Sequence, residues 1–257
     1  MPVDLNLSEG ENTSPTPVVY YIKLSLSQQT YYRPMQWLAN LLSNLPHPFS
    51  VFAERFNKKP IAAIEELEYF VRTRAAYIAQ TAMYGYLKTR MGTAYRKIFE
   101  DEAFAKVIHA STVKLFGSCL CDLASFSATS IYIDSPGEKA QLRKLALRLY
   151  DQGIAEGLTP ESRELLEKGL RERLAQRLET SDREQADATM QAFCWSEEDI
   201  VRHAPVIESY KQLDAEIVQN SIRFRWVDVY QQAHKRYAPE ALRASWDEKK
   251  SAREVAP

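Results

Sequence analysis

A stripe of polar side chains runs through a stretch of sequence that is otherwise apolar. Its members are spaced by three and four residues and so share one face of a helix: Ser111, Lys114, Ser118, Asp122, Ser125 and Thr129. Titratable groups within apolar helices are frequent in functional sites. We therefore predict Lys114 and Asp122 as ligand-binding candidates, with Tyr77 and Tyr84 facing them from the preceding apolar segment. The alternatives are a solvent-facing stripe and a purely structural polar network.

A turn rich in basic residues is the second candidate site. Gly92 and Thr93 interrupt the helical pattern, and Thr93 is suited to cap a following helix whose unpaired N–H groups would point outward. Four basic side chains surround this turn: Lys88, Arg90, Arg96 and Lys97. Helix N-termini and basic side chains together favour anions, so the turn predicts an anion or phosphate site. An ordinary exposed loop between two long helices has the same composition.

Motifs that would assign a catalytic centre, a metal or a cofactor are absent from the sequence. The four histidines (His47, His109, His203 and His234) include none with Glu three residues before it, so the helical di-iron pattern is missing. The His-Glu-x-x-His, phosphate-loop and dinucleotide-binding patterns are missing too. Cys119 and Cys121 would point about 200° apart on a helix, which prevents them from sharing one ion. No catalytic residue, metal or cofactor is predicted.

The N-terminal region carries the signals for contact with a partner or a membrane. Residues 1–33 are expected to form a flexible or extended arm, in which residues 18–27 alternate between apolar and polar as a strand does. No second strand is evident, so this segment would pair with a partner, pair with another copy, or lie as an ordered arm on a helical body. Eight side chains are the predicted partner or membrane contacts, unless they belong to the core: Tyr20, Ile22, Leu24, Leu26, Trp37, Leu41, Phe49 and Phe52.

Helices must position all of these groups. From residue 34 to 133 the pattern predicts a helical core, built around one helix over 60–91 and another over 102–133. Pro60 suits the first turn of the former. The latter is rich in small residues, which let helix backbones approach closely, so the two are expected to form a central antiparallel hairpin.

Residues 134–257 read as a charge-rich helical half packed on that core, within one folding unit. Thr159 and Pro160 predict the start of a helix on which Leu166, Leu170, Leu174 and Leu178 form one narrow apolar stripe, while the rest of that helix is charged and solvated. Further helices are expected from Ser196, over 206–237 and over 239–250. The fold class is all-α, a multi-helix bundle with a short extended N-terminal arm.

Composition narrows the class of protein. The chain has 257 residues, a net charge of −1 and 45% hydrophobic residues, which is typical of a globular protein and not of a nucleic-acid binder. Three cysteines and no visible secretory signal favour the cytoplasm. The apolar stretch 104–133 contains Lys106, Lys114 and Asp122, so it is not expected to span a membrane.

Together these observations favour a non-catalytic helical interaction protein: an adaptor, a scaffold or a subunit of a larger assembly. Its partner would be another protein or a second copy of itself, with no nucleic acid, and it could lie at a membrane surface. The alternative is an enzyme or carrier for a small apolar or anionic ligand bound between helices. The polar stripe and the basic turn motivate that alternative.

Overall fold

A computed structural model describes residues 59–135, 138–180 and 184–254. All of these residues belong to one unit of the chain, Pro34–Pro257. Every regular element in these ranges is a helix, and a single isolated bridge joins Ile61 to Tyr237. The fold is all-α, as predicted. The N-terminal arm and the contacts predicted there, from Tyr20 to Phe52, lie outside the described residues.

The helical elements follow one another through the chain in this order: α3 (Ile64–Met91), η3 (Gly92–Ala94), α4 (Tyr95–Phe99), α5 (Glu102–Tyr132), α6 (Lys139–Gly157), α7 (Pro160–Arg163), α8 (Leu170–Arg177), α9 (Glu184–Asp187), η6 (Met190–Phe193), α10 (Cys194–His203), α11 (Glu208–Arg236) and α12 (Pro239–Glu254).

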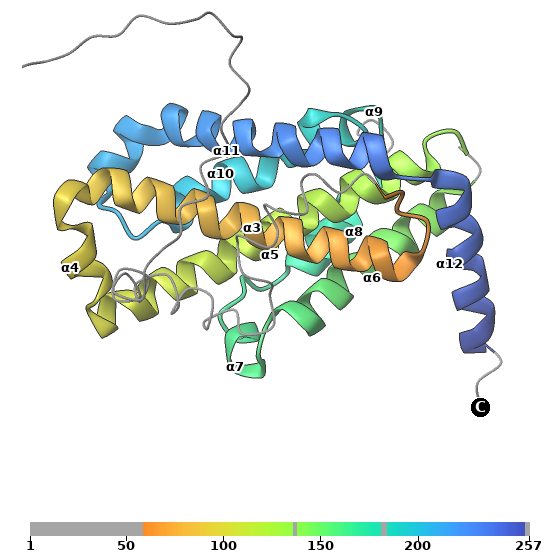
Figure 1. Cartoon of the computed structure of the whole chain (residues 1–257), viewed down its shortest axis with the longest axis horizontal. Coiled ribbons are helices and arrows are strands. Elements are labelled where there is room, and N and C mark those ends of the chain that lie inside the picture. Colours follow the sequence, from red (N-terminus) through yellow and green to blue (C-terminus); the bar gives the residue numbers. More distant parts are fainter. Residues whose placement is uncertain (1–58, 136–137, 181–183, 255–257) are drawn as a thin grey trace, which may run out of the picture. The chain divides into compact units, whose positions relative to one another are not determined.

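Helix α5 is the centre of the packing. It begins where the Asp101 side chain accepts a hydrogen bond from the Phe104 N–H at 2.8 Å, a regular N-cap. It packs against α3, α6, α8 and α10, and Figure 1 shows it crossing behind α3. Among the described helices, α5 alone is long and apolar enough to suit a membrane span, but 78% of its most apolar window is buried within the protein. Neighbouring helices therefore cover this apolar surface.

The start of α3 differs from the prediction. Pro60 was expected in the first helical turn, but the helix begins four residues later, at Ile64. The intervening backbone is extended because Ile61 pairs with the end of α11. Its N–H donates to the Arg236 carbonyl at 2.7 Å, and its own carbonyl accepts from the Ala238 N–H at 3.1 Å. A long-range contact thus overrides the local proline signal.

The prediction of a single helix over the four leucines is also wrong, because the chain forms two separate helices there, α7 and α8. Thr159 does start a helix, since its hydroxyl accepts a hydrogen bond from the Ser162 N–H at 3.3 Å, but that helix, α7, has only four residues. Gly169 then adopts φ +80°, a left-handed conformation that ends one segment before α8 begins. The apolar side of α8 is buried, with Leu170 and Leu174 1% and 0% exposed, whereas Arg171 and Glu172 between them are exposed. Leu170 and Leu174 are thus part of the hydrophobic core.

Small residues allow the close packing around α5. At Gly153 in α6, an added Cβ would lie 2.7 Å from the Cδ atoms of Leu120 in α5. At Gly117 in α5, it would lie 2.8 Å from Leu170 in α8. Contacts this short leave no room for a side chain, so these glycines set the distances between α5 and two of its neighbours.

Replacing Gly153 with valine is expected to destabilise the protein by about 1–3 kcal/mol, because the new methyl groups must displace Leu120 within a close-packed core. The free energy of unfolding from a denaturant titration measures the effect. The matched control is Ala155→Val, an exposed position on the same helix. Equal stabilities of the two variants would contradict this account of the α5–α6 packing.

Candidate functional site

A buried guanidinium lies at the junction of the C-terminal helices with α5. Arg177, at the end of α8, has a side chain that is 2% exposed. Its Nη1 donates to Asp122 Oδ1 at 2.9 Å, and its Nη2 donates to Asp187 Oδ1 at 2.6 Å and to the Ala192 carbonyl at 2.6 Å. One cation thus faces two buried carboxylates from α5 and α9. We refer to Arg177, Asp122 and Asp187 as the buried charge network.

Asp122 also caps α10 from outside that helix. Its Oδ2 accepts a hydrogen bond from the Ser196 N–H at 2.8 Å, which satisfies an N–H group of the first turn. Complete burial raises the pKa of Asp122 to about 6, and the Arg177 charge and the Ser196 N–H oppose that rise. The Ser196 hydroxyl in turn accepts from Trp226 Nε1 at 2.9 Å. Asp122 therefore connects α5 to α10 and, through Ser196, to α11.

The other polar members of the predicted stripe serve the same junction. Ser125 Oγ donates to Asp187 Oδ2 at 2.8 Å, and Ser118 Oγ donates to Asp199 Oδ2 in α10. Both serines are completely buried. The central part of the stripe, from Ser118 to Ser125, therefore faces neither solvent nor an open pocket, because α8, α9 and α10 cover it with complementary polar groups.

The remaining predicted ligand contacts do not join Asp122 in one cavity. Lys114 is half-buried one turn before Ser118, and Tyr77 and Tyr84 are half-buried on α3. The Tyr84 ring packs edge-on against Phe99, with ring centroids 5.4 Å apart. These three residues and Asp122 share no pocket in the part of the chain that the structure describes, so ligand binding by the four of them stays a prediction.

A group of titratable side chains that the sequence analysis missed lies beside the buried charge network. Polar atoms of Glu167, Asp199 and His203 all lie within 4.8 Å of one another. Arg202 Nη1 pairs with Glu167 Oε1 at 3.3 Å, and Nη2 pairs with Asp199 Oδ1, so a guanidinium already supplies the positive charge here. Burial lowers the pKa of His203 below its ordinary value. The spacing of Asp199 and His203, one helical turn apart, was the available sequence signal.

A histidine–serine pair occurs at α7. His109 Nε2 lies 3.1 Å from Ser162 Oγ, which also accepts from the Thr159 hydroxyl at 3.1 Å. Burial lowers the pKa of His109, which favours the neutral ring, and the tautomer of that ring decides whether Nε2 or the Ser162 hydroxyl donates. A serine nucleophile and its histidine base have this geometry in enzymes. Ser162, however, is only 5% exposed, so a substrate could not reach it. The pair anchors the short α7 to α5.

The basic turn is organised by contacts within the protein. Arg90 forms a two-pronged ion pair with Asp214 of α11, and Tyr86 donates to the same carboxylate at 3.0 Å. Lys88 Nζ lies 5.2 Å from the centroid of the Tyr95 ring. Thr93 lies within η3, whose N-cap is Met91, so the expectation that Thr93 caps the following helix is wrong.

Two of the basic groups in this turn are directed toward other elements, and the rest remain candidates. Lys97 is exposed, and the side chain of Arg96 lies outside the described set. Asp214 neutralises Arg90, which reduces the positive charge available to a phosphate. Anion binding at this turn stays a prediction.

An exposed apolar surface occupies one side of α11. Five of the eight large apolar side chains that are exposed in the described ranges lie between Ile207 and Phe224. Four of them follow helical spacing, and we call them the α11 stripe: Tyr210 (45% exposed), Leu213 (74%), Ile217 (73%) and Phe224 (79%). The opposite face of the helix carries Val218, Ile222, Trp226 and Val229, which are buried. Helix α11 is therefore apolar on two sides, one of them open to solvent.

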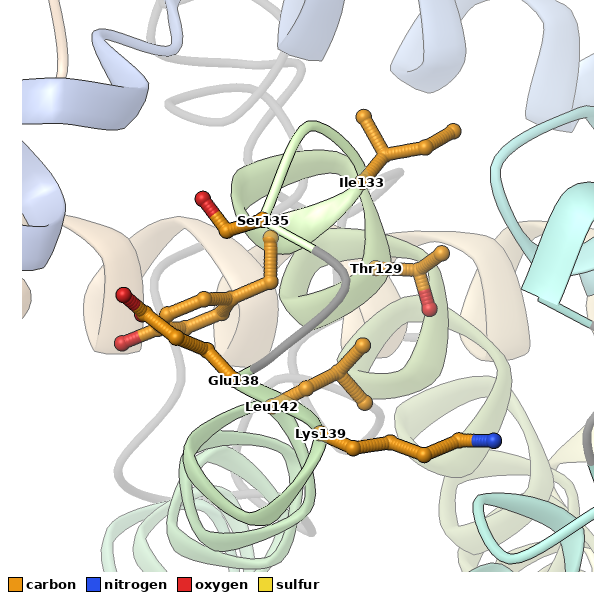
Figure 2. A pocket seen from close by; sticks show the side chains of 7 residues that line it. Thr129, Ile133, Ser135, Glu138, Lys139 and Leu142 are labelled. Atoms are coloured by element: carbon orange, nitrogen blue, oxygen red, sulfur yellow. The ribbon is translucent and has the colours of Figure 1, made fainter.

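The described cavities are small or shallow. Figure 2 shows one at the turn from α5 to α6, where Thr129, Ile133, Lys139 and Leu142 surround a hollow of about 40 Å³. A hollow of that size holds a few water molecules and no cofactor. A wider, open depression of about 350 Å³ borders Lys59 and Arg236. Neither is lined by the buried charge network or by the candidate ligand residues.

Comparisons with known proteins give no assignment: no family model matches the chain, and no curated protein or solved structure is detectably similar to it.

The buried charge network is expected to be critical for stability. Arg177→Met leaves Asp122 and Asp187 buried without their cation, which should cost about 3–5 kcal/mol of unfolding free energy. The control is Arg171→Met in the same helix, where a surface ion pair with Asp151 is lost at a cost of about 1 kcal/mol or less. Denaturant titration of both variants measures the difference. Similar losses would show that Arg177 does not carry the junction.

Protonation of His109 should oppose folding in mild acid. Because burial lowers its pKa in the folded state, the unfolded chain binds this proton more readily, and stability falls as the pH drops below about 6.5. His109→Gln should therefore flatten the dependence of unfolding free energy on pH in this range. An NMR titration of the ring reports the pKa directly, and a value above 6.5 would refute the assignment.

Proposed function

We propose that this protein is a non-catalytic helical interaction protein whose binding surface is the α11 stripe. The observation that carries the proposal is the gathering of large apolar side chains, up to 79% exposed, on one side of a well-packed helix. Exposed apolar side chains scattered singly are ordinary, whereas a contiguous patch marks a place where another surface packs. The partner that fits a single helical stripe is an amphipathic helix.

The placement of the titratable groups supports a binding role over a catalytic one. Asp122 and Asp187 face a buried guanidinium, and Ser118 donates to the buried Asp199. Groups held in this way maintain the packing of the helices and are not presented to a substrate.

The attachment of α11 would make the stripe a rigid surface. At one end, Arg90 and Tyr86 of α3 hold Asp214, and the Arg90 guanidinium lies 4.4 Å from the centroid of the Tyr210 ring. Further along, Arg223 Nε donates to Glu197 of α10 at 2.9 Å. Figure 1 shows α11 running beside α10 and α3 along one side of the bundle. A surface held in place before binding loses less conformational entropy when a partner arrives.

In this proposal the long antiparallel hairpin over residues 60–133 serves as the platform, and the N-terminal arm adds a second contact region. The protein would act in the cytoplasm, as an adaptor, a scaffold or an assembly subunit. Contact with a membrane surface through Trp37, Leu41, Phe49 and Phe52 is compatible with this role and independent of the α11 stripe.

Photo-crosslinking in the native cell tests the binding surface. A photoreactive amino acid in place of Ile217 should give discrete protein adducts, because this position would lie inside an interface. The same amino acid in place of Gln212, which is also exposed on α11 but lies about 140° around the helix from Ile217, serves as the control and should give fewer adducts. Mass spectrometry identifies what is attached. No adducts at position 217, or equal labelling at both positions, would refute the proposed function.

A further inference from the structure

The α11 stripe has the spacing of a coiled-coil seam. Its members fall at positions 210, 213, 217 and 224, which correspond to a, d, a and a of a heptad pattern. The d positions that complete the pattern are Asn220, which is exposed, and Val227, which is half-buried. Alternation of three and four residues keeps these side chains on one line along the helix. The partner best suited to the stripe is therefore another helix with the same repeat.

Charge is distributed unequally along α11. The first ten residues carry three acidic side chains and one lysine: Glu208, Asp214, Glu216 and Lys211. The remainder carries four basic side chains and one aspartate: Arg223, Arg225, Lys235, Arg236 and Asp228. Two copies of this helix aligned in parallel would place like charges together. In the antiparallel register given below, residues 208–217 of each helix would lie beside residues 220–229 of the other, which carry Arg223, Arg225 and Asp228 and so have the opposite net charge.

We infer that α11 pairs with α11 of a second copy of this chain, antiparallel and related by a two-fold axis. This inference rests on the proposed function and names its partner. With a positions facing d positions, Leu213 packs against Phe224 of the second copy and Ile217 packs against Asn220. The flanking Glu216 then lies beside Arg223 of the second copy, whose guanidinium also pairs with Glu197 in its own chain, so one acidic–basic contact occurs on each side of the axis.

The polar residue in the seam supports one register. A single buried Asn in an otherwise apolar seam commonly fixes the alignment of two helices. Asn220 Oδ1 already accepts a hydrogen bond from Arg223 Nη1 of its own helix at 2.9 Å, so its NH2 group is the part that would pair across the seam. Asn220 lies next to the two-fold axis of the proposed pair, where the two copies of this residue are close together. A two-fold arrangement also closes the assembly at a dimer, since each copy uses its only stripe on α11.

Sedimentation equilibrium of the full chain over a series of concentrations tests the dimer. Wild type should dimerise, and Leu213→Glu combined with Ile217→Glu should raise the dissociation constant at least about tenfold. Both side chains are more than 70% exposed, so the double variant should keep its helical circular dichroism and thermal midpoint. The matched control is Val107→Glu combined with Ile133→Glu, which adds the same charge at exposed apolar positions (48% and 47%) off α11 and should still dimerise.

Cysteine crosslinking tests the orientation. Mixed Leu213→Cys and Phe224→Cys proteins should form a disulfide-linked dimer under mild oxidation, because these positions face each other in the antiparallel pair. Phe224→Cys alone should not, since its two copies lie 11 residues apart along the axis, about 16 Å, beyond the reach of a disulfide. Wild type under the same oxidation controls for the native cysteines.

The outcomes separate the two proposals. A wild-type monomer at all concentrations, dimers unaffected by the stripe variant, or crosslinking of Phe224→Cys alone would each overturn the self-pairing described here. Adducts at position 217 with only a different protein would also overturn it, while the proposed function would stand. Absence of any adduct at position 217 would remove the proposed function and this inference with it.

Discussion

The packing of the C-terminal helices on α5 depends on the burial of one positive charge. Transfer of the Arg177 guanidinium out of water carries a large desolvation cost, which is offset only when both Asp122 and Asp187 face it. These residues come from three separate helices. The desolvation cost of Arg177 is therefore offset in only one arrangement of α5, α8 and α9. Apolar side chains of the same volume would tolerate several arrangements. The network therefore specifies how the helices are placed more than it adds to the free energy of folding.

That specification extends to the outer helix. Asp122 caps α10 through the Ser196 backbone, and the Ser196 hydroxyl accepts from Trp226 of α11. The position of α11 about its own axis is thus linked to the buried charges, and this rotation decides which apolar residues enter the core. Trp226 is completely buried, whereas Phe224, two residues earlier, is 79% exposed. A helix with two apolar faces can pack either face against the core. The polar contacts of α11 with α3 and α10 determine which face is buried.

Local sequence patterns predicted the helices and failed at the contacts between distant segments. The extents of α3, α5 and α11 follow from apolar periodicity and lie within a few residues of the prediction. Arg177 could not be recognised as the partner of Asp122, because 55 residues separate them and neither has a local signature. The helix start predicted at Pro60 was wrong for the same reason: a contact distant in sequence, between Ile61 and the end of α11, keeps this segment extended. The heptad spacing of the α11 stripe was visible in the sequence, but its exposure depends on which face of α11 packs inward.

The backbone pairing of Ile61 with residues 236–238 has a consequence for synthesis of the protein. Ile61 is 1% exposed, and Arg74 in α3 donates to Gln232 near the end of α11. The first described helix therefore lacks part of its cover until residues 232–238 have left the ribosome, and at ordinary elongation rates the synthesis of the intervening chain takes on the order of ten seconds. During that interval the nascent chain displays apolar surface from α3 and α5. The fold thus closes late, and its early helices are natural substrates for chaperones that hold apolar segments during translation.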